Sequence, residues 1–212
     1  MDKNTATRAT ILTEAKKIFQ NKGYRNTSMQ DIADASGISK SLLKYYFPRK
    51  EMFADVIMHD YMESIRDYVK QIDEVKNDAV TAYVLTMLIY YGNIYSNEAI
   101  RRFNSEALLV YKGSDVGNGK NMDEIYREII NQCNLRLTEE LFKIRKIQII
   151  GAQVYLLDAS NTDDSISDED RFAVAIYSTL VLLGVSSSVY ELSMEKASKI
   201  FHNINLKHFS ML

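Results

Sequence analysis

Apolar residues recur at helical spacing along almost the whole chain. The first stripe lies on one face of a helix that should stop near Gly23, and it consists of Ala9, Leu12, Ala15, Ile18 and Phe19. Two short helical segments follow over residues 28–36 and 40–46, joined by a turn that contains Gly37. A longer helix is predicted from about residue 49 to 72, because a proline, here Pro48, is tolerated at a helix start.

The rest of the chain keeps this period and predicts helices near residues 78–96, 97–111, 122–137, 139–160, 168–190 and 193–208. Residues 112–121 and 161–170 have the glycine-rich or acidic composition of loops. The run Val84–Tyr91 has the composition of a strand, but its neighbours keep helical spacing. One proline and eight glycines in 212 residues also favour long helices over a turn-rich β-sandwich, so the predicted fold class is all-α.

The segment Phe172–Tyr190 carries no charge, and its length is close to that of a membrane span. It contains several Ser and Thr residues and lacks a flanking cluster of Lys or Arg, so a helix buried on all sides of a soluble protein is favoured. The first ten residues show no apolar targeting segment, and the single Cys133 fits a reducing compartment. We therefore expect a cytoplasmic protein without a membrane partner.

The overall composition is that of a globular protein, with 46% hydrophobic and 25% charged residues and a formal net charge of −2. This net charge hides an asymmetry along the chain. Residues 1–50 hold ten basic and four acidic side chains, a balance of +6, and the remaining residues carry a balance of −8. A basic segment on an acidic body suggests a polyanionic partner for the basic part, although solvated helix faces could give the same distribution.

Residues 28–47, SMQDIADASGISKSLLKYYF, have the layout of a DNA-binding helix-turn-helix, whose second helix enters the major groove. Ser28 is placed to cap the first helix and Asp31 to lie in its first turn. At 100° per residue, one side of the second helix carries Lys40, Ser41, Lys44 and Tyr45, and Leu43 lies opposite. Two lysines in neighbouring turns repel each other unless a polyanion faces them. A small core should hold the two helices together, formed by Ile32, Ala33, Ile38 and Leu43.

Over about residues 8–56 the sequence resembles the tetracycline-repressor (TetR) family of bacterial transcriptional regulators. The resemblance rests on Phe19, Gly23-Tyr24, Thr27-Ser28, Ile32-Ala33, Gly37-Ile38-Ser39, Leu43, Tyr45-Tyr46-Phe47 and Lys50-Glu51. It implies a three-helix DNA-binding domain over residues 1–50 and a helical ligand-sensing and dimerisation domain over residues 51–212. It also implies a homodimer and a small-molecule inducer.

The resemblance assigns roles to particular residues of the first domain. The positions that match groove-facing residues, and so base contacts, are Lys40, Ser41, Leu42, Lys44 and Tyr45. The positions that match phosphate contacts are Thr27, Ser28, Tyr46 and Lys50. The sequence departs from the family pattern at Lys44, where an aromatic residue is common, and at Ser41-Leu42, where small polar pairs are common, so the operator sequence stays open. Without this context, the aromatic run 45–47 would be read as core or interface packing and the lysines as solvated surface.

The second domain holds most of the tyrosines and methionines, which suit a mostly apolar pocket with a few polar groups. The candidate pocket residues for a small apolar or aromatic effector are Met87, Tyr90, Tyr91, Ile94, Phe103, Tyr111, Tyr126 and Gln153. Such a stripe is more often plain core packing, and Gln153 inside an apolar run is more often satisfied by the backbone than by a ligand. The helices over 139–160 and 168–190 are the candidates for a dimer interface. The second is apolar or small all round, so a two-fold interface could cover it at Ala173, Ile176, Tyr177, Leu180 and Gly184, although a central helix of a monomer gives the same pattern.

The sequence offers little for catalysis, metal binding or a cofactor. His59, His202 and His208 are scattered, and no metal-ligand spacing or glycine-rich phosphate loop occurs. We therefore expect a protein that is not an enzyme, needs no cofactor and acts as a homodimeric repressor released from double-stranded DNA by a small molecule. The alternative is the same DNA-binding fold with a protein partner in place of the inducer, as in a co-activator or a DNA-bound structural factor.

Overall fold

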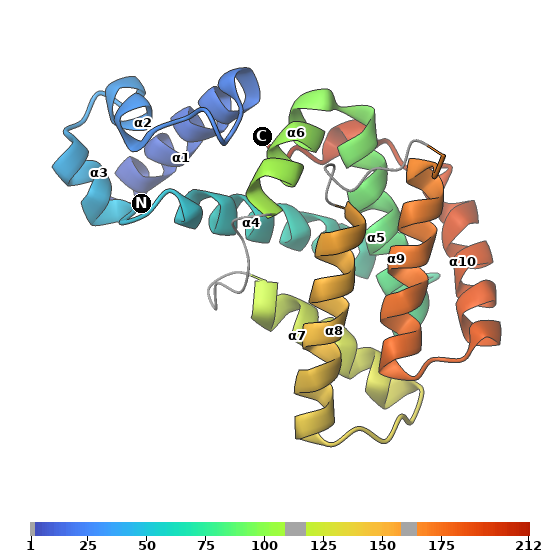
Figure 1. Cartoon of the computed structure of the whole chain (residues 1–212). Coiled ribbons are helices and arrows are strands. Elements are labelled where there is room, and N and C mark those ends of the chain that lie inside the picture. Colours follow the sequence, from blue (N-terminus) through green and yellow to red (C-terminus); the bar gives the residue numbers. More distant parts are fainter. Residues whose placement is uncertain (1–2, 109–117, 158–164) are drawn as a thin grey trace. The chain divides into compact units, whose positions relative to one another are not determined.

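The computed structural model describes residues 3–108, 118–157 and 165–212, and the regular secondary structure within these ranges is helical (Figure 1). The α-helices are α1 (Lys3–Lys22), α2 (Met29–Ala35), α3 (Lys40–Tyr46), α4 (Glu51–Lys70), α5 (Ala79–Ser96), α6 (Glu98–Leu108), α7 (Asn118–Gln132), α8 (Glu139–Leu157), α9 (Asp168–Leu183) and α10 (Ser187–Phe201). A short 3-10 helix, η2 (Leu206–His208), follows α10. The predicted all-α fold is confirmed.

The single helix expected over residues 168–190 is wrong, because the chain breaks it at Gly184. This glycine has a φ of +103°, in the left-handed region, and its N–H donates to the carbonyl of Leu180 at the end of α9. The Ser186 hydroxyl then accepts the N–H of Val189 and starts α10. A pattern of apolar residues does not show such a break, because Gly and Ser also fit a continuous buried helix. Among the described helices, none is long and apolar enough to cross a bilayer.

The chain divides into two compact units. Unit 1 comprises Met1–Tyr61, Ile94–Asn118 and Ser210–Leu212, and unit 2 comprises Met62–Asn93 and Gly119–Phe209. Helices α4 and α5 each contribute residues to both units. The chain thus crosses between the units inside helices, with no loop linker at these two crossings.

An aromatic cluster forms the core of unit 1. Phe47 stacks on Phe53 with ring centroids 4.0 Å apart. The rings of Phe19, Tyr24 and Phe103 contact one another, with centroid distances of 5.3, 5.5 and 5.9 Å. Of the predicted small core, Ile32, Ala33 and Leu43 are fully buried and Ile38 is partly buried. Because α6 delivers Phe103 to this cluster, Phe103 belongs to the core of unit 1, where sequence reasoning had grouped it with the tyrosines of the second domain.

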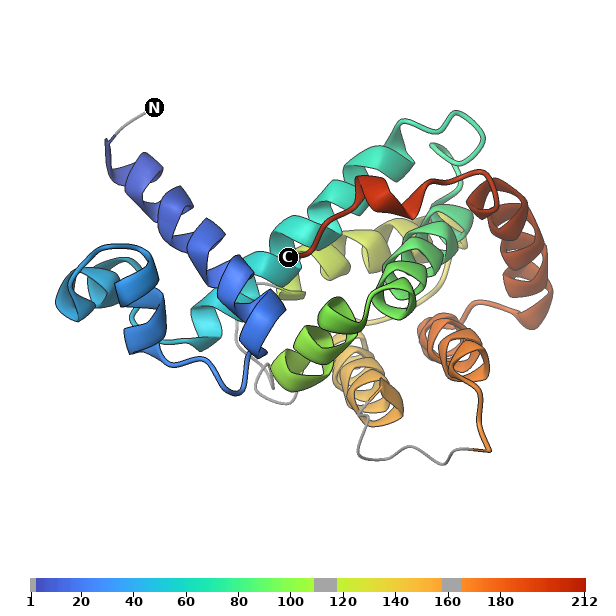
Figure 2. The ribbon, with the colours of Figure 1, turned by 90° about the horizontal axis from the view of Figure 1, so that it is seen from above.

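In unit 2, the antiparallel helices α8 and α9 pack together, and α10 packs on α9 (Figures 1 and 2). Ion pairs join neighbouring helices at its periphery. Asp123 of α7 pairs with Lys146 of α8 at 2.8 Å, and Lys196 of α10 pairs with Asp78, just before α5, at 3.0 Å. Ion pairs at the periphery that solvent still reaches contribute little each, so apolar packing between the helices accounts for most of the stability of the unit.

Candidate nucleic-acid interface

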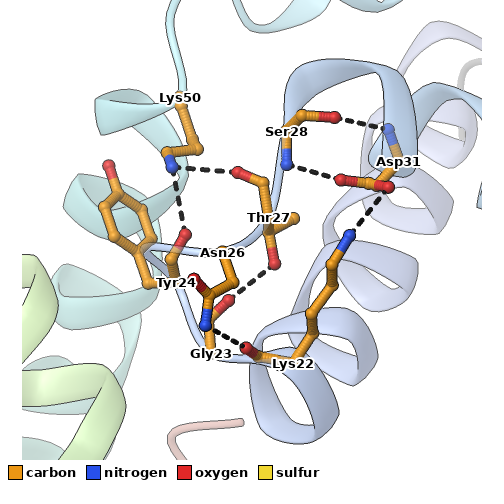
Figure 3. Close-up of polar contacts among 8 residues, drawn as sticks. All are labelled: Lys22, Gly23, Tyr24, Asn26, Thr27, Ser28, Asp31 and Lys50. Carbon is orange, nitrogen blue, oxygen red and sulfur yellow. Dashed lines mark hydrogen bonds and ion pairs between the residues drawn. The ribbon is translucent and has the colours of Figure 1, made fainter.

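Ser28 caps α2, as the sequence predicts, and Asp31 makes this cap reciprocal. The Ser28 hydroxyl accepts the N–H of Asp31 at 3.1 Å, and the Asp31 carboxylate accepts the N–H of Ser28 at 2.6 Å (Figure 3). Lys22 at the end of α1 pairs with the same carboxylate at 3.0 Å. The backbone hydrogen bond from Ser28, followed by the contacts with the Ser28 hydroxyl and Lys22, lowers the pKa of Asp31 to about 2. The first turn of α2 therefore carries a negative charge at neutral pH.

The turn between α2 and α3 depends on Gly37. Its φ is +65°, a value that glycine adopts at little cost, and this lets the N–H of Ile38 reach the carbonyl of Ala33 at 3.1 Å. The Ser39 hydroxyl accepts the N–H of Leu42 at 3.2 Å and caps α3. Since α2 and α3 also pack on each other, the angle between them is set by both the turn and the buried contacts.

Helix α3 turns one face inward and the other to solvent. Leu43 is fully buried, and so is Phe47 at its end. The five residues predicted to contact bases are all exposed, with Tyr45 70% exposed, and they are Lys40, Ser41, Leu42, Lys44 and Tyr45. One exposed tyrosine and one exposed leucine, beside two exposed lysines on a helix this short, form a surface whose chemistry suits a partner.

The four residues predicted to contact phosphate differ in their surroundings. Ser28 is exposed and Tyr46 is half-buried, with its ring against Tyr45 at 5.2 Å. Thr27 is only 2% exposed, and its hydroxyl donates to the Gly23 carbonyl at 2.6 Å. Lys50 is half-buried, and its ammonium donates to the carbonyls of Tyr24 and Thr27 (Figure 3). Ser28 and Tyr46 thus remain the freer of the four to reach a phosphate.

Some basic side chains of residues 1–50 are held by contacts within the protein, and others are exposed to solvent. Lys22 is paired with Asp31, Lys17 pairs with Glu14 at 2.7 Å, and Arg8 lies over the Phe47 ring at 4.9 Å. Exposed cations remain on α3 at Lys40 and Lys44, just after it at Arg49, and in the loop before α2 at Arg25. Three of these four cations thus lie on α3 or within a few residues of its end.

Sequence reasoning missed the contacts that α6 makes with the end of α1 and the loop after it. Glu106 accepts the N–H of Arg25 at 2.7 Å, and Arg102 donates to the carbonyl of Gln20 at 2.8 Å. Both contacts join residues about eighty positions apart. In each, the partner in α1 or in the loop contributes a backbone atom, so no side-chain pattern in the sequence indicates the contact.

Alanine at Gly23 should destabilise unit 1 more than alanine at Gly37. Both glycines have positive φ values, +85° and +65°, so each substitution carries a backbone cost of about 1 kcal/mol. A Cβ at Gly23 would also lie 3.1 Å from Glu106 and 3.3 Å from Arg102, whereas a Cβ at Gly37 meets nothing within 4 Å. Urea unfolding of the two variants measures the difference, and equal midpoints would contradict a close contact with α6.

Of the predicted pocket residues, those of unit 2 are mainly buried. Met87, Tyr90, Tyr91 and Tyr126 are buried, and Tyr91 stacks on Phe172 with ring centroids 4.2 Å apart. Gln153 is partly buried, and its amide donates to the Thr179 hydroxyl at 3.1 Å, so a side chain satisfies it where we expected backbone.

Ile94 and Phe103 lie in unit 1, and Tyr111 lies outside the described residues. Burial raises the pKa of both Tyr83 and Tyr126, so these phenols stay protonated and can donate a hydrogen bond at neutral pH.

The predicted dimer residues on α9 separate by burial. Ile176 and Leu180 are fully buried within unit 2, whereas Ala173, Tyr177 and Gly184 are exposed. Exposed apolar side chains continue along the outer surface of α9 and α8, and they are Val174, Val181, Ile144, Ile147, Ile150 and Tyr155. We name this set, with Tyr177, the α8–α9 face.

Comparison with known proteins agrees with this geometry. Residues 11–56 match the family model described as bacterial regulatory proteins, tetR family. The HTH-type transcriptional regulator YuxN of Bacillus subtilis (strain 168) is 32% identical over 88 residues, which cover 42% of this chain and 30% of that protein. The HTH-type transcriptional repressor KstR2 of Rhodococcus jostii (strain RHA1) is 34% identical over 58 residues, which cover 27% of this chain and 28% of that protein. The matches thus span less than a third of either relative.

The fold of the whole chain has its counterpart among solved structures. The crystal structure of RolR in complex with the ligand resorcinol superimposes with a TM-score of 0.61 at 17% identity, over 93% of this chain and 95% of that one. An identity this low shows a shared fold and no more. Residues 11–56 therefore match the tetR family of bacterial regulatory proteins, and the chain shares its all-helical fold with RolR.

Proposed function

We propose that the protein is a homodimeric transcriptional repressor that binds an operator through α3 and is released by a small aromatic or apolar molecule. The exposed face of α3 carries this proposal, since it lies in the segment that matches the family model and presents two lysines and a tyrosine to solvent. The name of the relative KstR2 describes a repressor, which supports repression here over activation.

Helix α3 has the size and chemistry for the major groove of DNA. The groove admits one α-helix, and a lysine there donates to the O6 or N7 of guanine. The Leu42 methyl groups suit a thymine methyl, and the Tyr45 ring adds apolar contact beside them. Ser28 and Tyr46, at the ends of α2 and α3, are proposed to contact the flanking phosphates. Base contacts then select the sequence, and phosphate contacts hold the register.

A second copy of the chain is the proposed partner of the α8–α9 face. Seven large apolar side chains are exposed on these two packed helices, among them Ile147 at 71%, and exposed apolar residues gathered in this way mark interaction surfaces. Two antiparallel helices that meet the same two helices of another copy form a closed, self-complementary interface. Dimerisation would also supply the two recognition helices that a pair of half-sites, about 34–36 Å apart, requires.

The effector is proposed to bind among the aromatic residues of unit 2. RolR, which shares the fold, was solved with resorcinol, a small phenol. Here the group includes Tyr83 and Tyr126, with ring centroids 6.2 Å apart, and the stacked pair Tyr91 and Phe172. Buried phenols and Gln153 provide hydrogen-bond partners within apolar surroundings. An effector releases DNA only if it binds the DNA-free conformation more tightly than the DNA-bound one.

The family and fold are those of DNA-binding regulators, so we propose no enzymatic activity and no cofactor. The helix α4 begins directly after the DNA-binding segment and runs into unit 2, which makes it the proposed route of the signal. Action on chromosomal DNA would take place in the cytoplasm.

Selection of bound DNA from a random-sequence duplex library tests this function. We expect the full chain to enrich a palindromic sequence, because a two-fold dimer presents two identical α3 helices. The selected duplex then serves as the probe for release by simple phenols, starting with resorcinol. Recovery of no sequence above background after repeated rounds would contradict DNA recognition. Enrichment without release by any phenol or other small apolar compound would contradict the proposed inducer class alone.

A further inference from the structure

The loop between α1 and α2, residues 23–28, is held by a cation at the start of α4. The Lys50 ammonium donates to the Tyr24 carbonyl at 3.0 Å and to the Thr27 carbonyl at 2.9 Å (Figure 3). It also lies 4.5 Å from the centre of the Tyr24 ring. Partial burial lowers the pKa of Lys50, while the negative charges of Glu51 and Glu106 raise it. Two of the three ammonium hydrogens are thus committed to the backbone of the loop.

An anion from α6 holds the same loop. The Glu106 carboxylate accepts the N–H of Arg25 at 2.7 Å, a position between the two carbonyls that Lys50 binds. Both carboxylate oxygens come so close to Gly23 that a Cβ there would lie 3.1 and 3.3 Å from them. One turn earlier on α6, Arg102 donates to the Gln20 carbonyl at 2.8 Å. Charged groups from α6 and from the start of α4 therefore fix the backbone from residue 20 to residue 27.

These contacts bear on DNA binding because the loop leads directly into the helix-turn-helix. Residue 28 is the cap of α2, and α2 packs on α3, with Ile32 and Leu43 both fully buried, so a displaced loop shifts the start of the helix-turn-helix. Glu106 itself cannot attract DNA, since a carboxylate repels phosphate. Charge-assisted hydrogen bonds to backbone are among the stronger single contacts, so their loss is enough to move a loop whose buried side chains are Tyr24 and Thr27 alone.

We propose that Lys50 and Glu106 are positioning residues for DNA binding. Their hydrogen bonds hold the loop of residues 23–28 and so set the placement of α2 and α3. This inference rests on the proposed function. It gives Glu106, which lies far outside the segment that matches the family model, a part in operator recognition. It also gives Lys50 a role other than the phosphate contact that sequence resemblance assigns to it.

Substitution of Glu106 distinguishes an electrostatic effect on DNA affinity from a positioning effect, because the two predict changes of opposite sign. Glu106→Gln removes a negative charge, so electrostatics alone predicts tighter binding, whereas loss of the grip on Arg25 predicts weaker binding. We expect the variant to bind the duplex selected by the wild-type chain about tenfold more weakly in fluorescence anisotropy, the size of one lost charge-assisted hydrogen bond. Glu106→Asp keeps the charge but shortens the reach, and it should weaken binding as well. The control Glu98→Gln, an exposed position on the same helix, should leave affinity unchanged.

Lys50 is tested by the dependence of affinity on salt. A lost phosphate contact would reduce the slope of log affinity against log salt concentration by about 0.9. We expect Lys50→Met to weaken binding about tenfold with a change in slope below about 0.3, because it loses two hydrogen bonds to carbonyls and no phosphate. The exposed neighbour Arg49, changed to Gln, is the matched control for removal of one positive charge. The double variant Lys50→Met, Glu106→Gln should bind little more weakly than either single variant, since both act on one loop.

Two further readouts separate positioning from loss of folding. Circular dichroism should show all variants folded at the assay temperature, and the amide proton resonance of Arg25 should move upfield in Glu106→Gln. Affinity equal to or above that of the wild type in Glu106→Gln would overturn the role of Glu106, and a slope reduced by about 0.9 in Lys50→Met would overturn that of Lys50. Failure of the wild-type chain to select any DNA would instead sink the proposed function, and the positioning role with it.

Discussion

Replacing Lys44 and Tyr45 together by alanine should lower affinity for the selected operator by about 2–4 kcal/mol, roughly 30- to 1000-fold. Both side chains are exposed on α3 and neither supports the fold, so the loss would come from contacts with bases. Affinity for unrelated duplex DNA should fall far less, because phosphate contacts by other residues remain. Anisotropy titrations with both duplexes at one salt concentration measure the ratio.

Stability measurements on the same helix provide the control. The double variant of Lys44 and Tyr45 should unfold within about 0.5 kcal/mol of the wild type, since exposed positions seldom affect stability. Leu43→Ala, one position before Lys44, should lose about 2–5 kcal/mol, because Leu43 is fully buried. An equal loss of affinity for operator and unrelated DNA in the double variant would show that α3 does not read sequence.

Aspartate at both Ile147 and Tyr177 should convert a dimer into a monomer of 24.4 kDa in sedimentation or light-scattering measurements. These side chains lie on the outer surface of α8 and α9, the two helices that pack together in unit 2. A two-fold interface contains each position twice, so the two substitutions would bury four carboxylates in an otherwise apolar contact. The monomer should also lose operator affinity, since it presents a single α3 helix.

Leu192→Asp is the matched control for the dimer. Leu192 is 69% exposed on α10, so it is as apolar and as accessible as Ile147. The control should leave the dimer intact if the second copy contacts α8 and α9. If Leu192→Asp dissociates the dimer while the Ile147 and Tyr177 variant stays dimeric, the interface lies on α10 and not on the α8–α9 face.

Much of the fold could be predicted from local patterns. The helical period indicated nearly every helix that the structure describes, and the caps of α2 and α3 lie at Ser28 and Ser39, as their side chains suggest. The boundary at Gly184 was missed because a glycine within an apolar run signals either a break or a tight helix contact. Only the backbone conformation, with its positive φ, distinguishes the two.

The contacts of the candidate site that join distant parts of the chain could not be predicted from the sequence. Phe103 was expected to face the tyrosines of the second domain, but α6 brings it to Phe19 and Tyr24. The contact between Glu106 and the N–H of Arg25 could not be foreseen, since nearly every residue offers the same backbone N–H. A lysine at position 50 suits a phosphate contact and a contact with backbone carbonyls equally well. Only the structure shows that its ammonium group donates to carbonyl oxygens.

The sequence by itself determined the helix-turn-helix and the outward side of α3, because helical period and capping are properties of neighbouring residues. It also separated a basic segment from an acidic body, which charge counting alone reveals. The tertiary structure decided which of those basic side chains stay accessible and which, like Lys50, hold the backbone. It decided too which apolar residues of α9 face the core and which face solvent. The accessibility of a lysine and the burial of an apolar side chain both depend on contacts with helices that are distant in the chain. Such contacts produce no periodic pattern in the sequence.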